Sequence, residues 1–418
     1  MAFLGAALAA SHCRNAAIRP QGLTGHIGKI AIAQRGKPGY ESLMSDIDTF
    51  EIFLTAAPGL EAALLAEVRE AGFAAAKSVP GGVTVQGDWR EVWRANLCLR
   101  GAARVLARIG EFRAFHLAQL DKRARKFPWG EVLRKDVPVK VEVTTNKKSK
   151  IYHAGAAAQR VEKALVESFG ATLSKEAALT LKLRIDDNMC QFSVDTSGEG
   201  LHKRGHKSAV GKAPMRENLA ALFLRDCGFD GREPVVDPMC GSGTFVIEAA
   251  EIALGLVPGR SRSFAFEQMA SFDADAYAAL KAELTPQEVD ISALHFYGSD
   301  RNAGAVEMAT SNAARAGVTA ITQFSHHAVS DVMPPEGPAG LVIVNPPYGA
   351  RIGNKKLLFA LYGALGKTLM ERFSGWRVGI VTSETGLAKA TGLPLLPLGA
   401  PVAHGGLKIR LFKTAPLR

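Results

Sequence analysis

The feature that most constrains the fold is a four-residue apolar run, Leu341–Val344, which ends in Asn345 and two prolines. A run of this length is too short for a helix and predicts a buried strand. Pro346 and Pro347 deny the strand further hydrogen-bond donors, so the chain turns sharply where the strand ends. The turn presents the side-chain carbonyl of Asn345, backbone carbonyls and the ring of Tyr348. These groups can hold a planar amine by its N–H donors, although an ordinary proline turn has the same pattern.

Three strands predicted upstream of this run end in acidic residues. The strand at 234–236 ends at Asp237 and leads through a Gly-x-Gly turn into a helix over 245–254. Two more strands, at 295–298 and 321–326, are followed by Asp300 and Asp331. Strands that alternate with helices predict an α/β fold with a doubly wound, mostly parallel sheet, whose ligands bind outside the carboxyl ends of the strands. Helices at 303–316 and 355–372, a strand at 378–382, and a terminal antiparallel hairpin of 395–398 and 408–412 complete the predicted domain, with a helical insertion at 264–284.

The four strand ends together predict a site for a nucleoside cofactor. The glycines let the backbone approach a ligand closely, and the N-terminus of the helix favours electron-rich groups. An acid after the second strand is placed to accept both ribose hydroxyls, and Asp331 is placed to meet an adenine amine. The chain has no Gly-Lys-Ser/Thr motif, which excludes nucleoside triphosphate hydrolysis. The predicted cofactor residues are Asp237, Pro238, Cys240, Gly241, Ser242, Gly243, Thr244, Asp300, Asp331 and Asn345.

The net charge of +11 is concentrated in the front half of the chain. Residues 1–43 carry five basic residues and one acid, and residues 44–212 carry 27 basic and 20 acidic residues, whereas residues 213–418 carry 19 of each. The excess is therefore +4, +7 and zero in the three segments. A basic unit joined to a neutral one favours a polyanion-binding handle on a catalytic domain, and nucleic acid is the expected polyanion.

The front half predicts small α+β units that carry the basic clusters. Its strands are expected at 50–54, 83–86, 137–144, 181–185 and 190–195, and its helices at 61–71, 89–99 and 154–169. One basic cluster stands beside Phe127 and Trp129, which suits phosphate contact combined with base stacking. A second cluster follows the strand at 137–144, and a third lies in the glycine-punctuated linker near 198–207. The predicted RNA-contacting residues are Lys122, Arg123, Arg125, Lys126, Lys147, Lys148, Lys150, Lys203 and Arg204.

Composition excludes several other classes of protein. The five cysteines are scattered, so neither a disulfide framework nor a metal site is expected. No apolar stretch approaches the ~20 residues that a membrane span requires, and a cytoplasmic protein is expected. Residues 1–43 contain no acid before Glu41, which is typical of a transit peptide, or translation begins at Met44. Little fold is expected of this segment.

Residues 237–244, Asp-Pro-Met-Cys-Gly-Ser-Gly-Thr, together with Gly298-Ser299-Asp300 and residues 345–349, Asn-Pro-Pro-Tyr-Gly, resemble class I S-adenosylmethionine-dependent methyltransferases that act on an exocyclic amine. Residues 56–61, 195–205 and 213–220 are similar to the THUMP-domain rRNA guanine-N2 methyltransferases. The resemblance covers residues 49–418. It implies a Rossmann-like class I methyltransferase domain at 227–418, behind a ferredoxin-like part at 44–86, a THUMP RNA-binding domain at 87–198, and a linker with a connecting helix at 199–226. Residues 1–43 would be a leader that is disordered or not translated.

The resemblance implies transfer of a methyl group from S-adenosyl-L-methionine to the N2 amine of a guanine in 23S rRNA, without a metal. Asn345, Pro346, Pro347 and Tyr348 would be catalytic, with the Asn345 and Pro346 carbonyls accepting the amine N–H groups and Tyr348 stacking on the base. The same corner serves tRNA guanine N2, adenine N6 in RNA or DNA, or a glutamine side chain. A further alternative is a non-catalytic RNA-binding protein with a degenerate methyltransferase fold. The chain departs from the family at residues 1–43, which match nothing in it, and at His206, where tyrosine is usual. Some relatives carry a second methyltransferase domain after the first, and none is expected here. The sequence indicates no oligomeric state.

Overall fold

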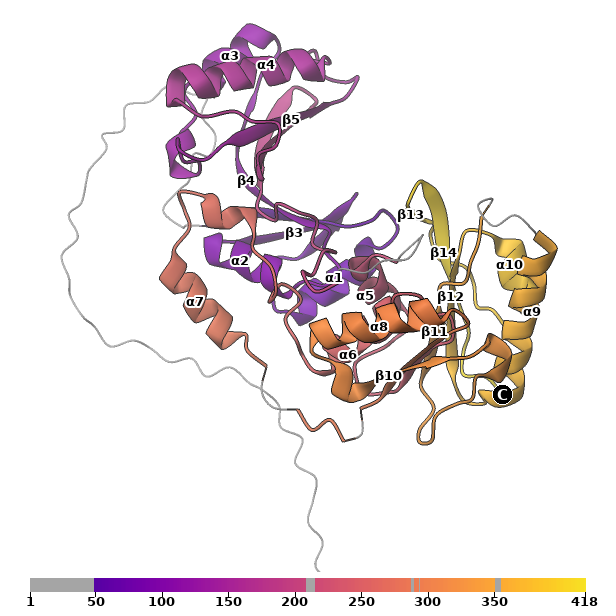
Figure 1. Cartoon of the computed structure of the whole chain (residues 1–418). Coiled ribbons are helices and arrows are strands. Elements are labelled where there is room, and N and C mark those ends of the chain that lie inside the picture. The colour runs from indigo at the N-terminus through magenta and orange to yellow at the C-terminus, as the bar shows by residue number, and fades with distance from the viewer. Residues whose placement is uncertain (1–48, 208–214, 287–288, 293, 350–354) are drawn as a thin grey trace, which may run out of the picture. The chain divides into compact units, whose positions relative to one another are not determined.

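The structure, a computed structural model, describes residues 49–207, 215–286, 289–292, 294–349 and 355–418. The leader predicted at 1–43 therefore lies outside the described residues. The described residues form two seven-stranded sheets with helices packed against them (Figure 1). The first sheet belongs to the basic front half of the chain, and the second belongs to the neutral back half. None of the described helices is both long enough and apolar enough to cross a bilayer.

The first sheet has the strand order β2-β3-β1-β4-β7-β6-β5, and all neighbours are antiparallel except β5 and β6. β4 is the longest strand and pairs with β1 on one side and β7 on the other. One continuous sheet therefore runs through the two front units that the sequence predicts as separate domains. The strands are β1 (Phe50–Thr55), β2 (Lys77–Val79), β3 (Gly82–Gly87), β4 (Arg104–Arg113), β5 (Val139–Thr145), β6 (Leu179–Asp186) and β7 (Met189–Asp195).

Local chemistry explains where the elements of this half begin and turn. Asp88 begins a helix by accepting a hydrogen bond from the Glu91 N–H at 2.9 Å, which satisfies one of the unpaired donors of the first turn. The β6–β7 hairpin turns through Asp187 and Asn188 at φ +46° and +61°, a conformation that these short polar residues tolerate. The helices are α1 (Glu61–Glu70), α2 (Trp89–Cys98), α3 (Leu117–Ala124) and α4 (Ala154–Ala164). A π-helix (Leu165–Phe169) continues α4, and a 3-10 turn (Trp129–Glu131) follows α3.

The second sheet confirms the predicted doubly wound fold. Its order is β10-β9-β8-β11-β12-β14-β13; the first five strands are parallel, and β14 is antiparallel to both of its neighbours. The chain winds outward in both directions from the β8–β11 pair, which makes the carboxyl edge of this pair the topological switch point. The strands are β8 (Val235–Asp237), β9 (Phe296–Asp300), β10 (Thr322–His326), β11 (Leu341–Val344), β12 (Arg377–Thr382), β13 (Val402–His404) and β14 (Leu407–Lys413).

Both faces of β11 are buried, which is why its sequence is continuously apolar. Leu341 and Ile343 pack with the helices of one face, whereas Val342 and Val344 pack with α9 on the other. Helices therefore cover the sheet on two sides. The helices are α5 (Glu217–Asp226), α6 (Thr244–Ala253), α7 (Ala274–Glu283), α8 (Ala303–Ala316), α9 (Lys355–Arg372) and α10 (Thr385–Ala390), with 3-10 turns at Ala265–Gln268, Thr319–Ile321 and Val329–Asp331.

One part of this half differs from the prediction, and another makes a contact that the sequence did not indicate. The first arm of the terminal hairpin is β13, not residues 395–398, because Pro394 and Pro397 remove donors from that run; Leu395 makes an isolated bridge to Thr414. The helical insertion exists, but α7 packs against α2 of the front half. Aromatic side chains of the insertion surround Trp93 of α2. The Trp93 ring centroid lies 5.8–6.2 Å from those of Phe266, Phe272 and Tyr277.

Candidate active site

Backbone hydrogen bonds hold the loop after β8 against the end of β9. The Cys240 N–H donates to the Ser299 carbonyl at 2.9 Å, and the Gly241 N–H donates to Asp300 Oδ2 at 3.1 Å. Asp300 Oδ1 accepts from the Asn302 N–H at 2.9 Å. The Asp300 carboxylate is therefore fixed at the edge of the sheet by one backbone donor on each oxygen. The structure thus brings the first two predicted strand ends together.

Gly243 completes this loop and begins α6. Its φ is +83°, and a Cβ added there would lie 3.0 Å from Ala309 Cβ and 3.2 Å from the Phe324 ring. Backbone conformation and close packing both require glycine at this position. The turn closes with a 2.8 Å hydrogen bond from the Gly243 N–H to the Cys240 carbonyl. The first-turn N–H groups of α6 then point toward the switch point, where they favour an electron-rich ligand.

Asp237, at the end of β8, is a buried carboxyl group with one hydrogen-bond donor beside it. Its Oδ1 accepts from the Met239 N–H at 3.1 Å. Burial raises the pKa of Asp237 to about 8, and the nearby negative charge of Asp300 adds to this effect. Asp237 is therefore protonated at neutral pH and carries a donor of its own.

The remaining predicted cofactor residues occupy different surroundings. Asp331 is exposed at the end of the 3-10 turn after β10, where Oδ1 accepts from the Ser330 hydroxyl at 3.1 Å. Pro238 and Cys240 are buried in the loop, and burial raises the pKa of the Cys240 thiol. The Ser242 carbonyl accepts from the Asn312 side chain at 3.0 Å, and the Thr244 hydroxyl accepts from Lys207 Nζ at 2.8 Å. Their predicted roles toward a cofactor remain predictions.

Asn345 follows β11 beside this loop, and its side-chain oxygen is buried. Within the described part of the chain, Asn345 Oδ1 has no hydrogen-bond partner. Buried acceptors are nearly always paired, and an unpaired one costs about 1–3 kcal/mol. An unpaired acceptor at a topological switch point fits a ligand that brings an N–H donor, as an exocyclic amine does. The residues present therefore fit the predicted substrate chemistry.

Two other elements hold the corner that follows Asn345. The Tyr362 hydroxyl, from α9, donates to the Pro347 carbonyl at 3.4 Å, and the Gly349 N–H donates to Glu384 Oε1 at 3.3 Å. The Tyr348 side chain is half-buried and packs against the apolar clusters of both faces of the sheet; burial raises the pKa of its phenol, so the hydroxyl stays protonated. Glu384 was not among the predicted site residues. The pattern that identified the other four strand ends, a polar residue just after a predicted strand, also holds after residues 378–382.

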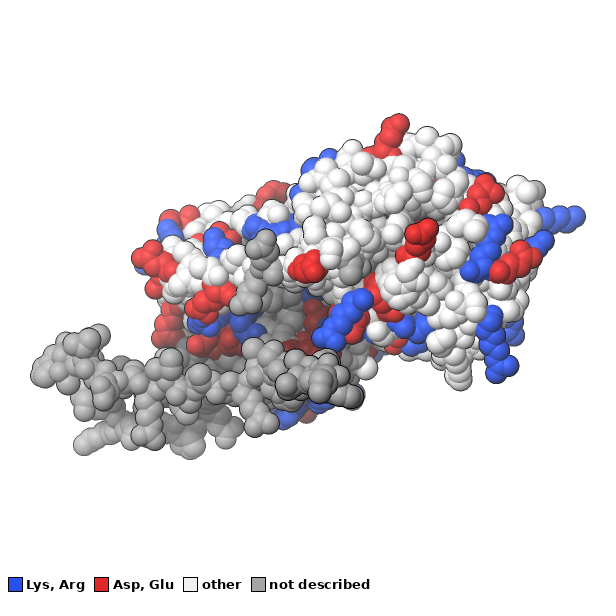
Figure 2. All heavy atoms as spheres, turned by 90° about the horizontal axis from the view of Figure 1, so that it is seen from below, with Lys and Arg blue, Asp and Glu red and all other residues white. Residues whose placement is uncertain are grey.

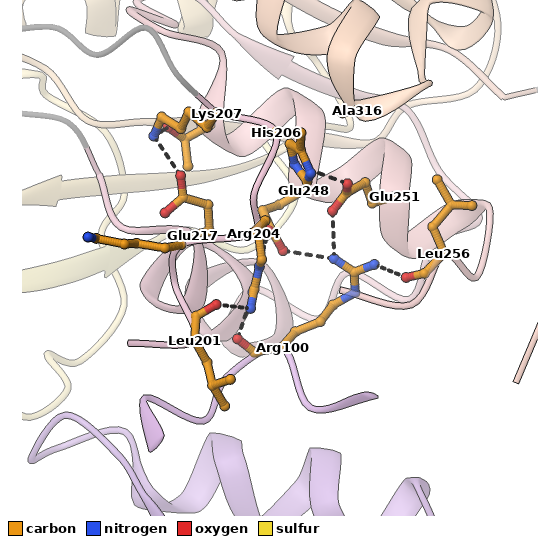
Figure 3. Close-up of polar contacts among 12 residues, drawn as sticks. Arg100, Leu201, Arg204, His206, Lys207, Glu217, Glu248, Glu251, Leu256 and Ala316 are labelled. Carbon is orange, nitrogen blue, oxygen red and sulfur yellow. Dashed lines mark hydrogen bonds and ion pairs between the residues drawn. The ribbon is translucent and has the colours of Figure 1, made fainter. Parts of the chain in front are cut away.

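The glycine-punctuated segment after β7 is an interior element as well as a linker (Figure 3). Arg204 is only 2% exposed. Its Nε donates to Glu248 Oε1 at 3.0 Å, and its two terminal nitrogens donate to the Leu201 and Arg100 carbonyls at 2.8 Å. The prediction that Arg204 contacts RNA is therefore wrong for this structure, because its guanidinium is buried and committed to these partners.

Arg204 belongs to an ionic cluster around Glu248 and Glu251 of α6, which we define as Arg100, Arg204, His206, Glu248, Glu251 and the half-buried Arg260. Figure 3 shows all of these except Arg260 as labelled side chains. Arg100 Nη1 lies 3.0 Å from both Glu248 and Glu251. Burial alone would raise the pKa of Glu251, but Arg100 and Arg260 outweigh it and hold that pKa below its usual value. His206 Nε2 lies 3.3 Å from Glu251, and burial lowers the pKa of His206.

The adjoining Lys207 connects the linker to the Gly-x-Gly loop. Its Nζ lies 2.9 Å from Glu217 Oε1 of α5 and 2.8 Å from the Thr244 hydroxyl of α6. Figure 3 shows the Lys207–Glu217 pair beside the ionic cluster. The linker therefore contacts the first turn of α6 and its middle at the same time, which fixes the helix that carries the predicted cofactor loop.

The other predicted RNA-contacting side chains are mostly on the surface. Lys122, Lys126 and the turn lysines after β5 (Lys147, Lys148, Lys150) are exposed, as is Lys203, which pairs with Glu199. Arg123 is half-buried 5.8 Å from the Phe112 ring, and Arg125 pairs with Asp121 at 2.8 Å and Glu167 at 2.7 Å. On the face drawn in Figure 2, charges of both signs are interspersed.

The predicted stacking role of Trp129 is wrong for this structure. The ring is 1% exposed, and its Nε1–H donates to the Ala124 carbonyl at 2.8 Å. Phe127 packs between this ring and Phe192, with centroids 4.4 and 5.3 Å away. These aromatic residues form the core beneath the basic cluster, so the cluster offers charge without a stacking platform from them.

The parallel sheet with this strand order, the Gly-x-Gly turn into α6 and the Asn-Pro-Pro corner at the switch point define a class I methyltransferase. A family model described as RMKL-like, methyltransferase domain, matches residues 204–394, and the RlmL ferredoxin-like domain model matches residues 51–106. The chain belongs to the RMKL-like methyltransferase family and carries the RlmL ferredoxin-like domain. The family predicted from the sequence is thereby confirmed.

Three relatives agree with this assignment. A protein of Synechocystis sp., "Putative RNA methyltransferase slr0064", is 32% identical over 369 residues, which are 86% of this chain and 95% of the relative. The structure of SMU.472, "a putative methyltransferase complexed with SAH", is 28% identical with a TM-score of 0.79 and covers 89% of this chain and 99% of its own. A predicted N6-adenine-specific DNA methylase from Listeria monocytogenes is 29% identical with a TM-score of 0.77, covering 88% and 96%. The cofactor of this family is S-adenosyl-L-methionine, as the sequence predicted.

Proposed function

We propose that the chain methylates the exocyclic N2 amine of a guanine in RNA, with 23S rRNA as the substrate. The observation that carries this proposal is the buried, unpaired Oδ1 of Asn345 beside the Gly-x-Gly loop. An acceptor in that position is satisfied when an amine donates one of its N–H groups to it. The family supplies the class of reaction, and the basic front half supports the polyanionic substrate.

The mechanism follows from what the corner residues offer. S-adenosyl-L-methionine, when bound, supplies an electrophilic methyl group on a sulfonium. The guanine amine is a poor nucleophile because its lone pair is conjugated with the ring. Asn345 Oδ1 and the Pro346 carbonyl accept its two N–H groups, which turns the lone pair toward the donor and stabilises the positive charge that develops on nitrogen. Tyr348 stacks on the extruded base. The proton leaves the nitrogen after methyl transfer, so no strong base is required.

The same edge of the sheet has the groups to hold the cofactor. Asp300 is fixed there by backbone donors and would accept the ribose hydroxyls, while Asp331, exposed after β10, would meet the adenine amine. Asp237, protonated at neutral pH, would add a donor near the loop. The first turn of α6 and the backbone of residues 238–244 complete this proposed site.

Residues 44–212 would hold the RNA through its phosphates, with 87–198 as the THUMP domain. The exposed Lys122, Lys126, Lys147, Lys148 and Lys150 would contact the phosphates, together with Arg123, Arg125 and Lys203. The Synechocystis relative carries the name "Putative RNA methyltransferase slr0064", which supports the same substrate class. The protein would act in the cytoplasm, where ribosomal RNA is found.

The second candidate is methylation of adenine N6. It is favoured by the Listeria neighbour, which is described as "a predicted N6-adenine-specific DNA methylase". The Asn-Pro-Pro-Tyr corner suits either amine, so the corner alone does not decide between them. Guanine in tRNA remains a third possible target of the same chemistry.

One experiment separates these candidates. Purified protein is incubated with labelled S-adenosyl-L-methionine and total RNA from a strain that lacks the gene; the 23S, 16S and transfer RNAs are then separated, and each is digested for nucleoside mass spectrometry. The proposal expects label in N2-methylguanosine of 23S rRNA, and far less label over the same time with the slower Asn345→Ala variant. Label in N6-methyladenosine, or in tRNA, contradicts it. The absence of transfer to any nucleoside, with cofactor binding intact, would favour a non-catalytic protein.

A further inference from the structure

A fifth strand end lies beside the corner and has no role in the mechanism above. β12 runs parallel to β11, with Val344 paired to Ile380, so both strands end at the same edge of the sheet. Neighbouring strands lie about 4.8 Å apart, which puts the residues that follow them within reach of one substrate. Glu384 comes two residues after the end of β12. Its carboxylate therefore belongs to the edge at which Asn345 and Tyr348 lie.

Contacts with the corner fix the position of this carboxylate. Glu384 Oε1 accepts from the Gly349 N–H at 3.3 Å, directly after Tyr348. The Glu384 N–H donates to the Thr382 hydroxyl at 3.3 Å, and its side chain, although at the N-cap of α10, does not cap that helix. The residue is half-buried. The hydrogen bond from Gly349 uses Oε1, which leaves Oε2 as the carboxylate oxygen that we assign to the substrate.

The Watson–Crick edge of guanine presents three N–H donors where this edge of the site presents three acceptors. Two donors are on N2 and the third is on the adjacent N1. Asn345 Oδ1 and the Pro346 carbonyl are assigned to the two amine donors, and Glu384 Oε2 is the third acceptor. An ionised carboxylate only accepts hydrogen bonds. Adenine has a lone pair at N1, next to its N6 amine, which would face the carboxylate with no hydrogen between them.

We propose that Glu384 is the residue that selects guanine over adenine, by accepting the N1–H of the extruded base. This inference rests on the proposed function, because it concerns which base the same site accepts. A site built to bond a substrate N–H discriminates strongly against an analogue that lacks it, since its own buried acceptor is then left unpaired. Glu384 thus sets base identity, while Asn345 orients the amine that reacts.

The test uses 2-aminopurine, which keeps the C2 amine of guanine but has a lone pair at N1. Two oligoribonucleotides span a segment of 23S rRNA that the protein methylates, and they carry guanosine or 2-aminopurine riboside at the target position. kcat/KM for methyl transfer is measured with wild type, Glu384→Gln and the control Glu371→Gln, which makes the same change on the exposed last turn of α9. Wild type and control should prefer guanosine by roughly 10- to 100-fold, the range for losing a hydrogen bond to a charged group.

Glu384→Gln should lose most of this preference, because an amide N–H can donate to the N1 lone pair of 2-aminopurine. The ratio of the two substrates is the informative readout, since a general loss of corner geometry slows both equally. An unchanged ratio in the variant shows that Glu384 only anchors Gly349 and overturns the inference, while the proposed function stands. Wild type that uses both RNAs equally also overturns it, whatever the variant does. Methylation of adenosine in place of guanosine by wild type refutes the proposed function itself.

Discussion

The buried acidic groups on the two sides of the Gly-x-Gly turn have opposite surroundings. Asp237, before the turn, accepts one backbone hydrogen bond, and burial raises its pKa to about 8. Glu251 lies after the turn, near the C-terminal end of α6. Arg100, Arg260 and His206 surround it, and its pKa is held below the usual value. Glu251 is enclosed by cations inside the fold, whereas Asp237, with a single backbone donor, lies at the sheet edge where a ligand is expected.

The side-chain oxygens of Asn345 and Glu248 show the same contrast in how completely they are paired. Glu248 has an arginine on each oxygen, at 3.0 Å in both cases, whereas Asn345 Oδ1 has no partner among the described residues. Glu248 lies on α6, just after the predicted cofactor loop, and Asn345 follows β11, which pairs with the β8 strand that leads into that loop. Their different degrees of pairing predict that changes in the ionic cluster act on stability and that changes at the switch point act on binding and rate.

The largest effect is expected from removing a member of the ionic cluster. Arg204→Met should lower the free energy of unfolding by about 3–5 kcal/mol, because it leaves a buried charge without its partner. Lys203→Met is the matched control: its exposed pair with Glu199 should contribute less than about 1 kcal/mol. Urea denaturation of both variants measures the difference. Equal stabilities would show that the cluster is not what distinguishes the two neighbouring residues.

At the switch point, Asn345→Ala should lower the single-turnover rate of methyl transfer by ~10²–10³, the range for one preorganised transition-state hydrogen bond. Stability and most of the cofactor affinity should remain. Asn345→Asp keeps the accepting oxygen but adds a charge that costs desolvation, so we expect a rate between those of Ala and wild type. Rapid-quench kinetics on a defined RNA tests both. Wild-type rates in both variants would reduce Asn345 to a turn residue.

A smaller effect is expected at Asp300, which is fixed by the backbone but has no cation beside it in the contacts described above. Asp300→Ala should weaken cofactor affinity by ~1.5–3 kcal/mol, the range for hydrogen bonds to a charged group. Calorimetric titration with S-adenosyl-L-methionine measures it directly. Affinity that stays at the wild-type value in a folded variant would remove Asp300 from the cofactor site.

The pH dependence of stability should distinguish the two kinds of buried acid. The pKa of Asp237 in the folded chain, about 8, lies above the roughly 3.9 of an unfolded chain, so its stabilising contribution is complete at low pH and is lost as pH rises toward 8. Wild type should therefore lose stability relative to Asp237→Asn between about pH 4 and pH 8, by up to about 1.4 kcal/mol per unit. Urea midpoints measured across this window test the sign. A parallel course of the two curves would mean that Asp237 is ionised throughout.

The smallest individual effects are expected at exposed charges. Replacing both Lys122 and Lys126 by alanine should reduce the slope of log affinity against log salt for RNA by about two, if each contacts one phosphate. Cofactor affinity should be unchanged. Filter binding at several salt concentrations measures the slope. A slope equal to that of wild type would show that this cluster is only solvated surface.

Local patterns were sufficient for much of the fold. The bounds of α8 and α9 are those predicted, and the apolar run of β11 indicated burial on both faces. β4 was missed because Gly110 and the bulge beside it interrupt the alternation of apolar residues that identifies a strand. Glu384 could have been predicted in the same way as the other strand ends, because it follows β12, the fifth parallel strand of the sheet.

Burial of charge could not be predicted in the same way. Arg204 and Lys203 are adjacent in a basic segment, yet one is buried and the other exposed. The difference depends on Glu248, which is distant along the chain, and on two backbone carbonyls. No local pattern contains this information, since long-range partners decide whether a cation is solvated or enclosed. The same holds for Trp129, whose core position depends on Phe192.

The ionic cluster also limits how the catalytic part can be separated from the rest of the chain. Arg100 lies in the segment matched by the ferredoxin-like model, whereas Glu248 and Glu251 lie in the segment matched by the methyltransferase model. A fragment cut at residue 204 would expose two carboxylates on α6 that have lost their shared arginine. The methyltransferase domain is therefore not a portable module: a gene fusion or truncation that drops Arg100 must replace both glutamates as well, and the two segments are expected to be inherited together.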